Sequence, residues 1–368
     1  MKVWSFHKAI HFVAVITLIV FCAGSVVAQA APGDSSKPVT SPDAQPAARG
    51  YISSSSLVPK IIEDWSTPSL KGSELKIGGT IVGDPSDRDS IFTREITRVE
   101  WRPGDPIDLY ILKPDGVKNP PVILYLYSYP FENDRFLNPE FGKFLTKNGF
   151  AAVGFASALT GQRYHTPRPM KEWFVSQLQE SLATSAHDVQ MILNYLASRG
   201  DMDMDRVGMF GDGSGASIAI LAAAVDPRIK TLDLLDPWGD WPEWIAKSTL
   251  IPEKERPDYL KSEYLAGVAP LDPVKWLPGL KTQKVRIQFV KSVTVTPAEA
   301  KQKVEGAAPA NAKIVHYDDA AAFRATIAGG TGLDWIKQQM QFSVAPPLSA
   351  TGKAQERSAS TQTKDSQR

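Results

Sequence analysis

Residues 206–225, RVGMFGDGSGASIAILAAAV, decide the fold of this chain. The apolar run at 207–210 predicts a short strand, and the alternating glycines Gly211, Gly213 and Gly215 predict a tight turn. The residues after the turn predict a helix, one face of which carries Ile218, Leu221, Ala222 and Val225. A strand that turns sharply into a helix directs backbone N–H groups and one side chain toward the space above the sheet edge. We therefore expect the functional site at this turn.

The segments on both sides of this turn alternate between strand and helix patterns. Two strands at 93–101 and 106–112 are joined by a Pro-Gly turn, and the next, at 121–127, is apolar on both faces, which is typical of a buried central strand. Strands regularly separated by helices require a mostly parallel sheet that is covered on both faces. The other expected strands lie at 151–155, 231–235, 285–290 and 312–317, and the other expected helices lie at 139–147, through 189–196 to Gly200, from Pro297, and through 333–340.

One segment interrupts this alternation. Residues 237–280 contain Trp238, Trp241, Trp244 and Trp276 and are too long for a simple connection. The segment follows the carboxyl end of a strand, where open α/β sheets bind ligands, so it is either a lid-like pocket wall or a small helical insertion packed by its tryptophans. As a pocket wall it would bring Trp238 and Trp241 to the ligand.

The first thirty residues are typical of a secretory signal peptide. Lys2 and Lys8 precede an apolar run that is followed by Ala28-Gln29-Ala30, and the run is shorter than the roughly 18 apolar residues of a membrane span. We expect cleavage near Ala30, export to the periplasm or medium, and no other membrane contact.

Composition excludes several classes of function. Cys22, the only cysteine, lies in the signal segment, so the mature chain is expected to have no disulfide and no thiolate site. Without Lys2 and Lys8, the 41 basic residues become 39 against 40 acidic ones, which argues against a nucleic-acid partner. Residues 31–50 and 345–368 are rich in small and polar residues and predict a disordered linker and tail around one domain at 51–344.

Three alternating aspartates raise the question of a metal site. Asp201, Asp203 and Asp205 are spaced as calcium ligands are, but Arg206 stands where a calcium loop needs glycine. We therefore expect a solvated connection there, and neither a metal nor a cofactor in the protein.

The chain resembles the α/β-hydrolase superfamily, in particular the group of dienelactone hydrolases and prolyl-oligopeptidase-like esterases. The resemblance covers roughly residues 93–340 and rests on YSYP at 127–130, DRVGMFG at 205–211, DPR at 226–228 and TP at 296–297. It implies the α/β-hydrolase fold, in which a nucleophilic serine occupies the apex of a strained G-x-S-x-G turn.

In that register the apex residue here is Gly213, which has no side chain to react. A shift by one residue would make Ser214 the nucleophile, with Asp212 in a position that normally holds a small residue. The sequence therefore leaves two alternatives, a catalytically inactive protein and a carboxylester hydrolase that uses Ser214.

The other catalytic positions also depart from the family pattern. No carboxylate follows the expected strand at 285–290, although Asp236 or Asp240 after the preceding strand resembles a variant position of the acid. The family histidine comes after the last strand, whereas His316 lies within it and His165 follows the strand at 151–155. Because a serine without a nearby base is a poor nucleophile, these departures favour loss of catalysis.

A ligand site can survive the loss of the nucleophile, because an oxyanion pocket needs only backbone N–H groups. The resemblance places these donors at Ser214 and at Ser128 or Tyr129. We expect them to hold a small acyl or carboxylate compound, or a glycan. The expected ligand-binding residues are Ser128, Tyr129, Arg163, Gly213, Ser214, Trp238 and Trp241.

The same turn also fits a different class of protein. Gly211-x-Gly213-x-x-Ala216 matches the dinucleotide fingerprint, with Asp236 about 20 residues further along to bind a ribose. At least two expected parallel strands precede the motif, and an exported protein rarely meets free NAD. We keep dinucleotide binding as a second alternative.

Overall fold

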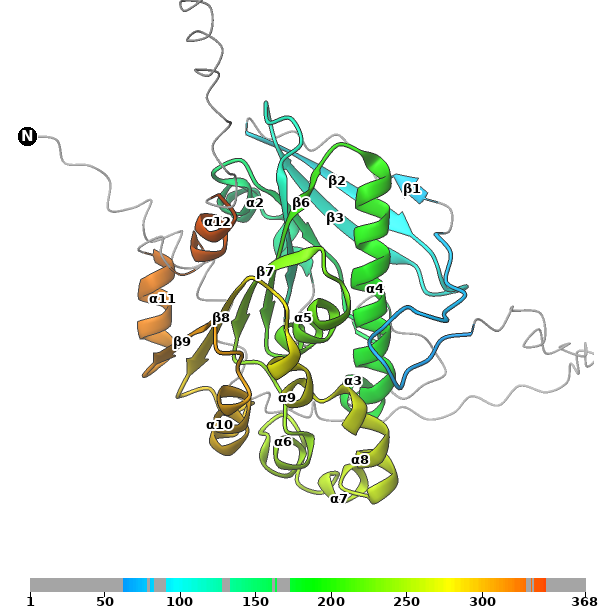
Figure 1. Ribbon diagram of the computed structural model, residues 1–368, viewed down its shortest axis with the longest axis vertical. Coiled ribbons are helices and arrows are strands. Elements are labelled where there is room, and N and C mark those ends of the chain that lie inside the picture. The colour runs from blue at the N-terminus through cyan, green and yellow to red at the C-terminus, as the bar shows by residue number, and fades with distance from the viewer. Residues whose placement is uncertain are drawn as a thin grey trace, which may run out of the picture.

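The computed structural model describes residues 62–77, 80–82, 91–127, 133–160, 163, 173–328, 332 and 334–341. The predicted signal peptide, linker and tail lie outside these residues. Within them, one nine-stranded sheet runs through the molecule with helices on both sides (Figure 1). The strand order is β1-β2-β3-β5-β4-β6-β7-β8-β9.

The sheet has an antiparallel start and a parallel remainder, which confirms the predicted mostly parallel sheet. Adjacent strands are antiparallel from β1 to β5 in this order and parallel from β5 to β9. The strands are β1 (Thr80–Val82), β2 (Phe92–Val99), β3 (Ile107–Pro114), β4 (Pro121–Leu126), β5 (Ala151–Gly154), β6 (Asp203–Asp212), β7 (Ile229–Leu235), β8 (Lys284–Val290) and β9 (Ala312–Tyr317).

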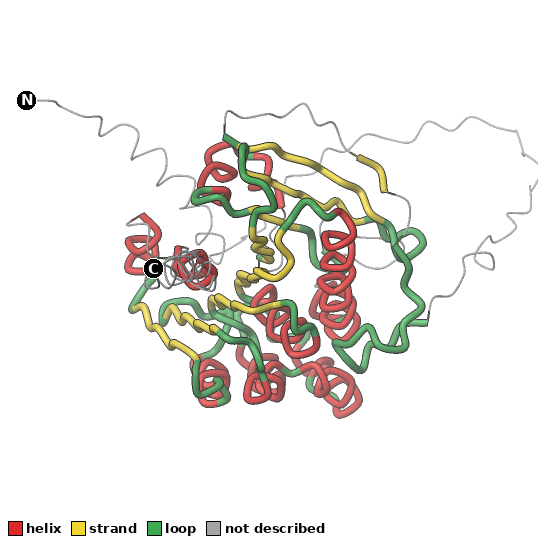
Figure 2. The backbone as a smooth tube through the Cα atoms, turned by 45° about the horizontal axis from the view of Figure 1, so that its top comes forward, coloured by secondary structure: helices red, strands yellow, loops and turns green. Residues whose placement is uncertain are grey.

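Helices cover the two faces of this sheet in separate layers, which Figure 2 shows with the strands between them. One face carries α4 (Leu178–Arg199), α5 (Ser214–Val225) and α10 (Ala298–Gly306), whose apolar residues join one core cluster. The other face carries α2 (Pro139–Thr146), α11 (Ala320–Ala328) and α12 (Asp334–Gln341), whose residues join a second cluster. Of these helices, α11 was not expected from the sequence.

The central strand β4 shows why the sequence folds in this way. All six of its residues are buried, with Val122 and Leu124 in one core cluster and Ile123 and Tyr125 in the other. Side chains alternate across a strand, so a strand covered on both faces must be apolar throughout. Farther along, α4 ends at Gly200, whose φ of 69° is the left-handed conformation of a helix end.

The insertion at 237–280 is a packed helical excursion. It consists of α6 (Trp241–Lys247), α7 (Arg256–Tyr259), α8 (Ser262–Val268) and α9 (Pro273–Trp276) with short 3₁₀ turns. The rings of Trp238 and Trp244 stack 4.5 Å apart, and Trp241 meets Trp244 edge-on at 5.8 Å. All three belong to the core cluster of α4 and α5. This supports the packing alternative for the tryptophans.

No helix among the described residues is long and apolar enough to cross a bilayer.

Candidate functional site

The turn between β6 and α5 is a sharp elbow with Gly213 at its apex. Gly213 has φ 55° and ψ −115°, a combination that residues with a side chain adopt only under strain. Its N–H donates to the carbonyl of Leu235 at 2.9 Å, which ties the apex to the end of β7. The elbow is therefore built at residue 213.

The two flanking glycines are required by the close packing of this elbow. A Cβ on Gly211 would lie 2.5 Å from Cα of Ala216, and a Cβ on Gly215 would lie 2.1 Å from the carbonyl oxygen of Leu126. Real Cβ atoms do not approach backbone atoms so closely. The packing therefore requires glycine at 211 and 215, two residues apart on either side of the apex. This sets Gly213 as the central residue of the motif.

Ser214 is the first residue of α5 and is fully buried. Its hydroxyl has no contact with solvent, and the apex conformation belongs to the preceding residue. This placement argues against Ser214 as a nucleophile. The backbone at the start of α5 has no side-chain cap, so the N-terminal N–H groups remain directed at the sheet edge.

Two carboxylic acids lie beside the elbow at the ends of neighbouring strands. Asp212 ends β6 opposite Leu235, and Asp236 follows Leu235 with a φ of 43°. Burial raises the pKa of Asp212 to about 7, and the charge of Asp236 raises it as well, against the lowering effect of Arg135. Asp212 still keeps some solvent-exposed surface. It is the ionisable group closest in sequence to the apex.

Asp236 is held from the opposite side by β8 and α10. Its carboxylate accepts from the N–H of Val290 at 3.1 and 3.3 Å, and the ammonium of Lys301 lies 3.0 Å from it. Burial raises the pKa of Asp236 to about 6, although the charge and hydrogen bond of Lys301 act against this. Lys301 also donates to the carbonyl of Val293 at 2.8 Å, which fixes the loop after β8.

Arg135 supplies positive charge on the other side of Asp212. It lies in the 3₁₀ helix η3 (Asn133–Leu137), and its guanidinium carbon is 3.6 Å from the ring centroid of Tyr127. Tyr127 is buried at the end of β4, and burial raises the pKa of its hydroxyl well above the usual range. Arg135, Tyr127, Lys301 and the role of Asp212 were not predicted from the sequence. Of these, only Asp212 had a signal in the sequence, which is its position next to the apex glycine.

Comparison with solved structures identifies this architecture. Acetyl xylan esterases from Paenibacillus sp. R4 and Thermoanaerobacterium sp. JW/SL YS485 superpose with TM-scores of 0.53 and 0.52, at 16% and 17% identity, over 65% of this chain and 82% and 81% of theirs. A putative dipeptidyl aminopeptidase IV from Bacteroides ovatus ATCC 8483 reaches 0.52 at 15% identity, over 71% of this chain and 37% of its own. The chain has the α/β-hydrolase fold. No protein-family model matches the sequence, and no curated protein matches it.

In an α/β-hydrolase fold the histidine reaches the apex from the loop after the last strand. Here that position is occupied by Asp318 and Asp319. His316 lies in β9, three strands from β6, which is about 14 Å at the usual strand spacing. Its ring stacks on Phe289, and its Nε2 lies 3.3 Å from Glu305 Oε1. His316 therefore does not serve the elbow, and His165 lies outside the described residues.

The other predicted ligand-binding residues lie in different parts of the structure. Arg163 is 1% exposed and is fully engaged by Asp105, Asp188 and the carbonyl of Ala156, so its guanidinium has a structural role. Trp238 and Trp241 are each 1% exposed and present no surface to a ligand here. Ser128 and Tyr129 lie outside the described residues. Gly213 and the backbone of Ser214 are the predicted residues that the structure brings to the site.

The dinucleotide alternative gains no support from this geometry. The acidic residue that would bind the ribose is Asp236, and its carboxylate is already bound by Lys301 and Val290. The approach to the turn is also occupied by Asp212, which would repel a pyrophosphate when ionised.

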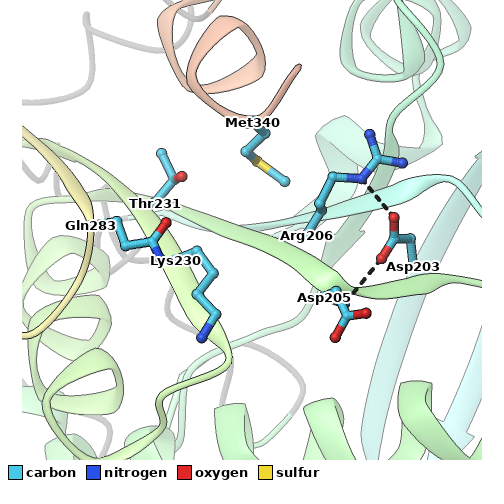
Figure 3. Close-up of a pocket in the computed structure, with 7 residues that line it drawn as sticks. All are labelled: Asp203, Asp205, Arg206, Lys230, Thr231, Gln283 and Met340. Carbon is cyan, nitrogen blue, oxygen red and sulfur yellow. Dashed lines mark hydrogen bonds and ion pairs between the residues drawn. The ribbon is translucent and has the colours of Figure 1, made fainter. Parts of the chain in front are cut away.

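Two cavities are lined by described residues. One, of about 320 Å³, opens at the amino ends of the parallel strands and is lined by Asp203, Arg206, Lys230 and Met340 among others (Figure 3). There Arg206 pairs with Asp203 at 2.6 Å, so the aspartate spacing reflects an ion-paired connection. The other, of about 500 Å³, lies between β8 and α10. The described residues contain no cluster of three or more potential metal ligands.

Proposed function

We propose that this protein is a catalytically inactive member of the α/β-hydrolase fold that binds a neutral, acyl-bearing, hydroxyl-rich ligand such as an acylated sugar. The observation that carries the proposal is the elbow itself: its strained geometry is intact, and its apex is Gly213. The turn from β6 into α5 that presents the nucleophile in such folds is thus kept here with a residue that cannot attack.

Three features support the absence of hydrolysis. Gly213 has no nucleophile, Ser214 is buried, and His316 is held at another part of the sheet. General-base assistance contributes about 10²- to 10⁴-fold in rate, and it acts only within hydrogen-bond reach of the nucleophile. Among the described residues, neither a reactive hydroxyl nor a histidine stands at the apex.

The charges around the elbow select among possible ligands. The N-terminus of α5 favours a carbonyl oxygen nearby, as the positive end of a helix does. Asp212 and Asp236 disfavour a carboxylate ligand, and Asp212 can bind hydroxyl groups, since a carboxyl group can accept or, when protonated, donate. A neutral ligand could place an acyl carbonyl at the N-terminus of α5 and its hydroxyl groups at the carboxyl group beside the elbow. The names of the acetyl xylan esterases with the same fold agree with an acylated glycan.

Binding is tested by calorimetry with acetylated xylo-oligosaccharides, their deacetylated forms and an acidic sugar. We expect the acetylated form to bind most tightly, and Gly213→Leu to weaken binding at least tenfold by occupying the apex. Gly279→Leu is the matched control, because a Cβ added to Gly279 would have no atom within 4 Å. Equal affinity of Gly213→Leu and the unchanged protein would place the ligand elsewhere.

Catalysis is tested separately with a fluorophosphonate probe and an acetyl ester substrate. We expect no covalent labelling and ester turnover equal to that of buffer. Labelling that disappears in Ser214→Ala would instead establish the esterase alternative.

We further propose that the protein is exported and cleaved near Ala30. The support is the order of Lys2 and Lys8, apolar run and small residues at the start of the sequence. N-terminal sequencing of protein from the cell envelope and medium is expected to begin at Ala31. A start at Met1 in the mature protein would contradict this.

A further inference from the structure

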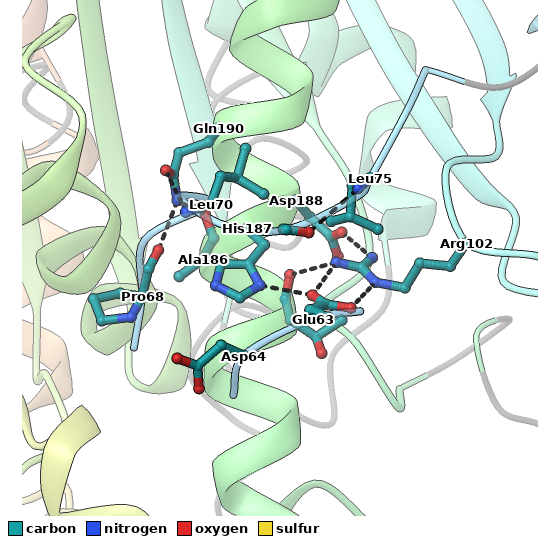
Figure 4. Close-up of polar contacts among 12 residues, drawn as sticks. Glu63, Asp64, Pro68, Leu70, Leu75, Arg102, Ala186, His187, Asp188 and Gln190 are labelled. Carbon is teal, nitrogen blue, oxygen red and sulfur yellow. Dashed lines mark hydrogen bonds and ion pairs between the residues drawn. The ribbon is translucent and has the colours of Figure 1, made fainter. Parts of the chain in front are cut away.

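Residues 62–77 form a strap that crosses α4 (Figure 4). Leu70 and Leu75 pack against the core cluster of α4. The side chain of Gln190 donates to the carbonyl of Pro68 at 2.7 Å and accepts from the N–H of Leu70 at 3.2 Å. The strap is thus bound to α4 mainly through side chains of the helix.

His187 holds the other end of the strap with both ring nitrogens. Nδ1 lies 2.6 Å from Oε1 of Glu63, and Nε2 lies 3.0 Å from the carbonyl oxygen of Thr67. A carbonyl oxygen only accepts. Glu63 is also an acceptor: burial raises its pKa, but hydrogen bonds from His187 and Arg102 lower it by more, so it stays ionised. Two acceptors require two N–H groups, which only the imidazolium form of histidine carries.

The charges in this buried cluster balance only when His187 is protonated. Arg102 binds Glu63 through two hydrogen bonds of 2.7 Å and also pairs with Asp188. Asp188 in turn pairs with Arg163, which pairs with Asp105. Three carboxylates therefore face two guanidiniums and one imidazolium. The exposed Asp64 also lies near His187 on the strap, and Arg228 donates to the backbone carbonyl of Gln190.

When the strap leaves and His187 loses its proton at the same time, the charges that remain in the cluster still balance. Without Glu63 and without the charge of His187, Arg102 and Arg163 still face Asp105 and Asp188. The body of the protein thus keeps its ion pairs when the strap leaves. In contrast, loss of the proton alone would bury a net negative charge and point a bare ring nitrogen at an acceptor, which is costly.

We propose that the contact between His187 and the strap is a pH-dependent switch. Protonated His187 holds residues 62–77 on α4, and deprotonation of His187 releases them while the rest of the α/β-hydrolase domain stays folded. Because two acceptors face the ring, the contact stabilises the strap only while both ring nitrogens carry a proton, so this stabilisation is present at low pH and absent at high pH.

Amide hydrogen exchange of the full chain tests this proposal. After correction for the intrinsic exchange rate, protection of residues 62–77 is expected to fall about tenfold or more between about pH 5 and about pH 9, while that of β6 stays constant. In His187→Gln the strap is expected to be poorly protected at both pH values. His316→Gln is the matched control, since His316 is half exposed and far from the strap, and it should behave as the unchanged protein.

Selective ¹⁵N labelling of the histidines gives an independent readout. The signal lost in His187→Gln should show two protonated nitrogens at the pH where the strap is protected. If that variant does not fold, Glu63→Gln keeps the shape of the contact but removes its charge, and it should shift release to lower pH. The proposal is overturned by a neutral His187 under the protected condition, by strap protection that does not change with pH, or by the same pH dependence in His187→Gln.

Discussion

Two groups of buried carboxylates in this protein have opposite electrostatic environments. In the cluster on α4, burial raises the pKa of Asp188, but the charges of Arg102 and Arg163 lower it by more, so it stays ionised. At the elbow, burial raises the pKa of Asp212 to about 7 and that of Asp236 to about 6, because only one cation faces each. The same residue type is thus charged and satisfied in one region and partly protonated in the other.

This difference separates a structural from a functional role. Buried charges that are fully paired hold elements together, and the removal of one partner leaves the other uncompensated. Incompletely compensated carboxyl groups with raised pKa values tend to occur at functional sites. The α4 cluster therefore predicts loss of stability on mutation, whereas the elbow predicts changes in binding and in pH dependence.

The largest expected effect comes from Asp188→Asn. This change leaves Arg102 and Arg163 without the carboxylate between them and should destabilise the fold by about 3–5 kcal/mol. Denaturant unfolding measures it. The control is Asp108→Asn at the surface pair with Arg98, which should cost less than about 1 kcal/mol. If Asp188→Asn and Asp108→Asn lower the free energy of unfolding by similar amounts, the buried ion pairs contribute no more to stability than the surface pair.

Gly215→Ala is expected to have the next largest effect at the elbow. Its Cβ would meet the carbonyl oxygen of Leu126 at 2.1 Å, and the backbone shift needed should cost about 3 kcal/mol. Gly279→Ala, where no atom lies within 4 Å of the new Cβ, should change stability by less than about 0.5 kcal/mol. Unfolding curves that agree for the two variants would show that the elbow is not tightly built.

Asp212→Asn should stabilise the protein in a pH-dependent way. The folded-state pKa of Asp212 lies above its unfolded value, so the unchanged protein loses stability as the pH rises from about 4 to about 7. At about pH 8 the variant should be more stable by at most about 4 kcal/mol, and by less where solvent reaches the carboxyl group; near pH 4 the two should agree. Thermal unfolding across this range checks the sign. A variant that is less stable at high pH would show that Asp212 is paired, as Asp188 is.

The smallest expected effect on stability comes from Gly213→Ala. A side chain at φ 55° and ψ −115° costs about 1 kcal/mol or slightly more in strain. Gly306→Ala, at the end of α10 with open space, is the control and should be neutral. The free energy of unfolding is measured in urea. If Gly213→Ala lowers it by no more than the control does, the apex is not strained by a side chain.

Much of the fold was predictable because it depends on local patterns. The apolar residues of β4 and the helix of α4 that ends at Gly200 were both predicted, and both are confirmed. The missed helix α11 has short, alanine-rich turns with little contrast between its faces. Among the site residues, Gly213 as the apex was also predicted, because the spacing of three glycines is a property of the sequence alone.

The sequence by itself determined the order of strands and helices and the absence of a reactive group at Gly213, because both depend on residues that are neighbours in the chain. Only the tertiary structure decided which charges are satisfied. Arg163 was predicted to bind a ligand, yet Asp105 and Asp188 engage it from distant segments. Asp212 was treated as misplaced, yet it faces Asp236 from the next strand. The pKa of a buried group depends on burial and on charges brought near by folding, and neither can be read from the order of residues.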